Sequence, residues 1–73
     1  MERFDMELDK WKDRIGKFCI IDYKTPNGTE TTIGELIDVT QGGLLLIKNL
    51  NNDEETEVSI NNIENSKIRE KRQ

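Results

Sequence analysis

The stretch TTIGELIDVTQGGLLLIKNL, residues 31–50, decides the fold class of this chain. Gly34 stands inside a β-prone run, and a glycine in a strand interior marks a bulge or a sharp bend. Leu36 and Val39 are three residues apart, so the apolar positions after this glycine do not alternate cleanly. The turn residues TQGG separate this run from the aliphatic run 44–47. The pattern predicts two antiparallel strands that bend as the strands of a small β-barrel do.

Three more strands are expected around this pair. The run KFCIIDYK, residues 17–24, is rich in β-branched and aromatic side chains. It ends in TPNG, where Pro26 fixes φ and Gly28 accepts a positive φ, so a tight reversal follows. ETEVSI, residues 55–60, alternates between polar and apolar positions, and a very short NN connection leads into IENSKI, residues 63–68.

A short amphipathic helix is expected ahead of the strands, over about residues 5–15. Asp5 would cap its start, and Gly16 would end it in the left-handed conformation. The apolar residues of the helix recur at spacings of three and four; they are Leu8, Trp11 and Ile15. We expect this stripe to close one open end of the barrel, with the last two residues as the lid.

The predicted fold class is therefore mainly β, with an N-terminal helix and a five-stranded, bent antiparallel barrel of the SH3 type. The 73 residues form a single domain, with the barrel over about 17–68 and a charged tail at 69–73. A core this small supplies little net stability, so we expect a homo-oligomer.

Composition excludes several classes of function. Histidine is absent, which removes the commonest general base and metal ligand, and no glycine-rich phosphate loop is present. We therefore expect no enzymatic activity, no cofactor and no metal site. Cys19 lies in an apolar run and is interpreted as a core residue. No signal-peptide core or membrane-length apolar run occurs, so a cytoplasmic location without membrane contact is expected.

The order of elements resembles the Sm and Sm-like family, which includes the Hfq-type RNA chaperones. The resemblance runs from about residue 6 to residue 68 and rests on IGKFCII, the NG reversal, GELIDV, LLLIKN and the INNI step. It implies strand pairing between subunits in rings of six or seven, with RNA bound at loops around the pore. The expected interface residues lie in the last two strands; they are Val58, Ile60, Ile63 and Ile68. Thr40 and Leu44 stand where the family has an aspartate and an asparagine.

Candidate RNA-binding residues fall in two turns and near the C-terminus; they are Gln41, Asn61, Asn62, Lys67 and Arg69. Amide side chains can read base edges, and cations can bind phosphates. For each residue a plainer interpretation exists, as a turn former or as part of a solvated tail. The net charge of −4 requires any contact with nucleic acid to be local.

Two alternatives to an RNA-binding ring remain open. The first alternative is an SH3-like protein-interaction barrel that binds a protein partner through residues 44–47 or through an edge strand, without nucleic acid. A third possibility is a subunit that pairs with a more basic homologous chain.

Overall fold

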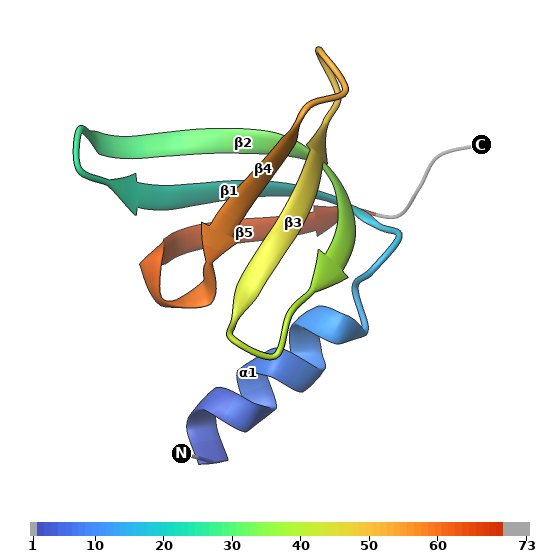
Figure 1. Cartoon of the computed structure of the whole chain (residues 1–73), viewed down its shortest axis with the longest axis vertical. Coiled ribbons are helices and arrows are strands. Elements are labelled where there is room, and N and C mark those ends of the chain that lie inside the picture. Colours follow the sequence, from blue (N-terminus) through green and yellow to red (C-terminus); the bar gives the residue numbers. More distant parts are fainter. Residues whose placement is uncertain (1, 70–73) are drawn as a thin grey trace.

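The computed structural model describes residues 2–69, with side chains from Glu7 onward, and Figure 1 shows a helix at one end of a bent sheet. The tail predicted at 69–73 lies outside these residues except for Arg69, which belongs to the last strand. The elements in chain order are α1 (Glu2–Lys12), β1 (Phe18–Thr25), β2 (Gly28–Val39), β3 (Leu44–Asn49), β4 (Glu55–Ser59), the 3-10 turn η1 (Ile60–Asn62) and β5 (Ile63–Arg69).

The five strands form one antiparallel sheet in the order β4-β3-β2-β1-β5. Within the described residues β4 and β5 are the two end strands, so the sheet is bent but not closed. This arrangement confirms the predicted class, a mainly β chain with an N-terminal helix and five bent antiparallel strands.

The bend lies in β2, the longest strand. Its first part pairs with β1 as far as Glu35, and its second part pairs with β3 from Gly34 onward. The register slips between Leu36 and Asp38, which leaves Ile37 as the extra residue of a bulge. The irregular apolar spacing after Gly34 thus predicted a real break in the alternation.

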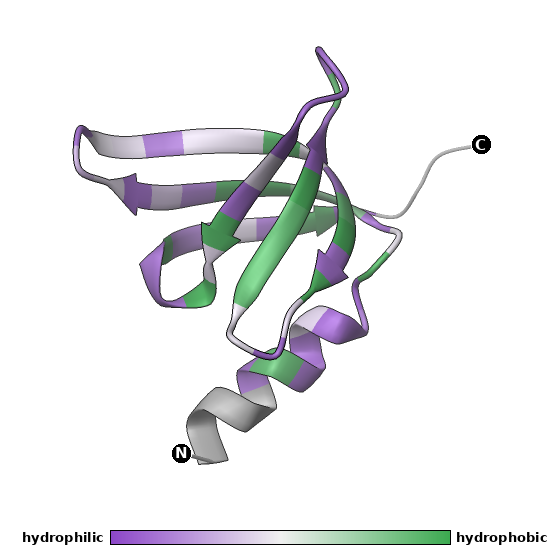
Figure 2. Cartoon of the chain, in the orientation of Figure 1, coloured by the Kyte–Doolittle hydropathy of each residue, from purple (hydrophilic) through white to green (hydrophobic). Residues whose placement is uncertain are grey.

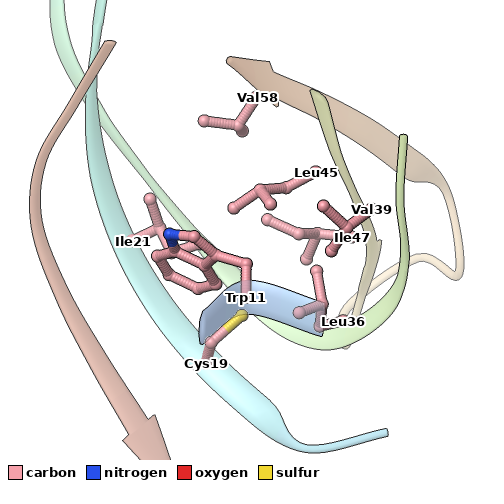
Figure 3. Packing of buried hydrophobic residues seen from close by; sticks show 8 residues of the cluster. All are labelled: Trp11, Cys19, Ile21, Leu36, Val39, Leu45, Ile47 and Val58. Atoms are coloured by element: carbon pink, nitrogen blue, oxygen red, sulfur yellow. The ribbon is translucent and has the colours of Figure 1, made fainter. Parts of the chain in front are cut away.

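The core lies on the inner face of the bent sheet, and α1 closes it from one side, as Figure 3 shows. Eight residues are buried there; they are Trp11, Cys19, Ile21, Leu36, Val39, Leu45, Ile47 and Val58. Figure 2 shows the corresponding apolar segments in α1 and along the strands, and a mostly hydrophilic tip on the β3–β4 hairpin. Burial of Cys19 confirms its interpretation as a core residue.

The helix differs from the sequence-based expectation at both ends. It already includes Glu2, so Asp5 lies inside it rather than at its cap, and it ends at Lys12. Ile15 therefore lies in the following turn, where its side chain is 42% exposed, and it is not part of the lid. Gly16 does take the predicted positive φ, +95°.

The aliphatic run in β3 has one buried face and one partly exposed face. Leu45 and Ile47 are fully buried, whereas Leu44 is 36% exposed and Leu46 is half-buried. The outer face of β3 is therefore only partly covered by the described residues.

Candidate functional site

Two turns that carry candidate residues lie side by side at one end of the sheet. The backbone N–H of Ile60 donates to the Gly43 carbonyl at 2.8 Å, and the adjacent Leu44 pairs with Ser59 across β3 and β4. The turn with Gln41 and the 3-10 turn η1 are thereby held together. Residues 20 positions apart in the chain thus lie in neighbouring turns.

The first turn makes two backbone–backbone hydrogen bonds within residues 40–44. The Gly43 N–H donates to the Thr40 carbonyl at 3.0 Å, and the Thr40 N–H donates to the Leu44 carbonyl at 2.9 Å. Gly43 has a φ of +90°, which a side chain would disfavour. Gln41 is exposed within this turn, so its amide group is free to meet a ligand.

The second turn presents two amide side chains to solvent. Ser59 Oγ accepts a hydrogen bond from the Asn61 backbone N–H at 3.3 Å, and the Ile63 N–H donates to the Ile60 carbonyl. These contacts use backbone groups and the Ser59 hydroxyl, and neither of them involves an asparagine side chain. No hydrogen bond between described residues engages the side-chain amide of Asn61 or Asn62, and both residues are exposed. The turn therefore offers unpaired donors and acceptors on a fixed backbone.

A groove of about 690 Å³ opens between α1 on one side and η1 and β5 on the other, and Asn61 lines it. The Arg14 guanidinium lies over the Trp11 ring, 4.7 Å from the ring centroid, at the helix side of this groove. Lys10 adds a second cation one helical turn away. Sequence reasoning missed both cations, although basic residues four apart around a tryptophan were a visible signal.

The charges of this groove are balanced. Glu7 and Glu64 line it together with the two cations, so an anionic ligand would be held by local contacts and not by a net positive field.

The charge of Arg14 also affects the core residue Cys19. Burial raises the pKa of the Cys19 thiol to about 11, and the charge of Arg14 lowers it only in part.

The two remaining RNA-binding candidates lie elsewhere. Lys67 is opposite Ile20 and Arg69 is opposite Phe18 across β1 and β5. Since Cys19 and Ile21 point into the core, these cations are on the outer face of the sheet. The structure therefore brings Gln41, Asn61 and Asn62 to neighbouring turns but does not join the two cations to them.

The four interface candidates differ in the solvent exposure of their side chains. Val58 is only 1% exposed because it is part of this chain's own core. Ile60, Ile63 and Ile68 are half-buried and pack against the edge of that core. All four belong to the end strand β4, the end strand β5 or the turn between them.

Two further observations concern the described residues as a whole. No group of three or more acidic or cysteine side chains among them is placed to hold a metal ion. Likewise, nothing helical in this part of the chain combines the length and the apolar character needed to cross a membrane.

No protein-family model, no curated protein and no solved structure matches the chain.

Proposed function

We propose that this chain is a non-enzymatic binding module of the Sm-like kind, which assembles edge to edge with copies of itself and associates with single-stranded RNA. The observation that carries the RNA proposal is the hydrogen bond from Ile60 to Gly43. It holds the turn of Gln41 beside the turn of Asn61 and Asn62, and the exposed amide groups of these three residues form the proposed binding surface.

The chemistry of this surface suits single-stranded RNA. An amide group has both donors and an acceptor, so it can pair with an unstacked base edge. Lys10 and Arg14 line the groove that begins at Asn61, and they are placed to neutralise a phosphate next to such a base. Because the groove also holds two carboxylates, we expect modest affinity that falls with salt.

Assembly is supported by the strand order. Both end strands have a backbone edge that no described strand occupies, and exposed strand edges pair with other strands unless they are protected. Pairing β4 of one copy with β5 of the next would satisfy both edges and would continue the sheet from copy to copy.

RNA binding is tested by titrating fluorescein-labelled oligo(U) and oligo(A) with the protein at low salt and following anisotropy. The variant N61A/N62A should weaken binding by about tenfold, the loss expected for two hydrogen bonds. The matched control N27A/N51A removes two exposed asparagines from other turns and should bind as the wild type does. Equal binding by both variants, or no binding by the wild type at low salt, would contradict the proposal.

One observation favours the protein-interaction alternative. Ile33 is 46% exposed and Leu50 is 54% exposed, and the Leu50 N–H donates to the Ile33 carbonyl at 3.2 Å. Ile20 is opposite Ile33 on the same outer face, so three apolar residues follow one another across β1, β2 and the turn after β3. If oligonucleotides do not bind, this row is the first place to test for a protein partner, with L50E as the variant.

A further inference from the structure

The two free edges of the sheet carry opposite charges on the same face. In β4, Glu55 and Glu57 are exposed and alternate with half-buried Thr56 and buried Val58, which take the inward positions of the strand. In β5, Lys67 and Arg69 are exposed on the outer face. No ion pair between described residues engages these four side chains, although Lys48 is opposite Glu55 across β3 and β4.

The spacing of these charges matches in one antiparallel register. When Glu57 of one copy is opposite Lys67 of another, antiparallel pairing also sets Glu55 opposite Arg69. In that register every residue of β4 has a partner within β5, from Glu55 opposite Arg69 to Ser59 opposite Asn65. A shift of two residues in either direction leaves at most one of these charge pairs between the strands.

The inner face accepts the same register. Side chains that are opposite each other in an antiparallel pair point to the same face, so the outward charges stay together. Val58 is then opposite Ser66, and Thr56 is opposite Ile68. No charged side chain is turned toward the core.

We infer that β4 of one copy pairs with β5 of a second copy in the register that joins Glu57 to Lys67 and Glu55 to Arg69. This inference rests on the edge-to-edge assembly proposed above and adds its register and its selectivity. Pairing β4 with β4 would place carboxylates opposite carboxylates, and pairing β5 with β5 would place cations opposite cations. Like charges opposite each other are destabilising, so the charges favour head-to-tail assembly of identical chains over either symmetric pair.

The test uses two full-length charge-reversal variants whose edges are complementary only to each other. In E55K/E57K both edges are basic, and in K67E/R69E both edges are acidic. Each variant alone should lose self-association, with an apparent dissociation constant raised by about tenfold or more. An equimolar mixture should recover assembly, because each β4 then finds an oppositely charged β5. The readout is native mass by light scattering at micromolar concentration.

Matched control variants distinguish the effect of charge on β4 and β5 from the effect of the net charge of the chain. D9K/D13K and K12E/K24E change the net charge by the same amounts as the two test variants, at exposed positions outside β4 and β5. Both should assemble as the wild type does. Circular dichroism of each variant shows whether it folds, and the variant with all four reversals should assemble again by itself.

The outcomes distinguish this inference from the proposal on which it rests. A wild type that is monomeric at all concentrations overturns both. A wild type that assembles while E55K/E57K and K67E/R69E assemble equally well overturns the charge register and leaves edge-to-edge assembly standing. Loss of assembly by the folded variants without recovery in the mixture also overturns the register.

Discussion

The backbone carbonyl of Lys48 occupies the space that a side chain on Gly34 would need. Gly34 and Lys48 belong to neighbouring strands, and the contact lies where β2 passes from its pairing with β1 to its pairing with β3. A Cβ atom at this position would meet backbone atoms, which cannot move aside without shifting β3. The bend of the sheet therefore depends on a glycine here.

The first prediction is that Gly34→Ala destabilises the protein by about 2 kcal/mol or more, because the added methyl group overpacks the strand crossing. The measurement is urea unfolding followed by circular dichroism. Gly42→Ala is the control, since the nearest atom to its added methyl group would be Thr40 Oγ1 at 3.8 Å. We expect a change of about 0.5 kcal/mol or less for the control. Equal effects of the two substitutions would show that the close approach does not matter.

The second prediction concerns the lid of the core. Trp11 is 3% exposed, and its removal in Trp11→Ala should cost about 3 to 5 kcal/mol in the free energy of unfolding. Ile15→Ala should cost far less, because Ile15 lies beyond the end of α1 and is 42% exposed. Comparable losses in denaturant titrations of the two variants would mean that the helix continues to Ile15, as the apolar spacing alone suggested.

The third prediction separates the two faces of β3. Leu45→Glu should abolish cooperative unfolding, because Leu45 is fully buried and a carboxylate there would have no partner. Leu44→Glu should fold, since Leu44 is 36% exposed on the outer face. Chemical-shift dispersion in a proton–nitrogen NMR spectrum distinguishes the two cases. A folded Leu45→Glu protein would contradict the assignment of the inner face.

The fourth prediction is a loss of stability at alkaline pH through Cys19. Burial raises the pKa of this thiol from 9.0 to about 11, so the folded state favours the protonated thiol. The resulting stabilisation is fully present below pH 9 and is lost as the pH rises through the folded pKa near 11. It amounts to about 2 to 3 kcal/mol.

The measurement is the free energy of unfolding of the wild type minus that of Cys19→Ala between pH 8 and pH 11, since the alanine variant lacks the thiol but keeps all other titrating groups. Tyr23 belongs to that shared background, because burial and the charge of Glu30 raise its pKa as well. A difference that stays constant over this range would contradict the account.

Much of the fold was predictable because its signals are local. The glycine in β2, the reversal at Pro26–Gly28 and the alternation in β4 each act through the backbone of a few residues. The end of α1 was not predictable in the same way. Ile15 continues the apolar spacing of the helix, but residues 13–16 form turns, and the Gly16 N–H donates to the Leu36 carbonyl at 2.8 Å. A contact between distant residues thus replaced the local pattern.

The candidate site was predictable only in part. Turn chemistry identified Gln41, Asn61 and Asn62, but their proximity depends on a hydrogen bond between Ile60 and Gly43 that no local pattern encodes. The groove cations Lys10 and Arg14 were missed because they line a binding groove only when η1 lies next to the helix. Lys67 and Arg69 were chosen for their positive charge near the C-terminus, whereas the strand register places them on the outer face of β5, away from the turns.

The central claim is that the open sheet is completed by neighbouring copies of the same chain. The most direct test is the native mass of the wild-type protein, measured by light scattering over a range of micromolar concentrations. We expect a discrete assembly, several times the 8.5 kDa of one chain, that dissociates as salt is raised. A mass of 8.5 kDa at every concentration would contradict it.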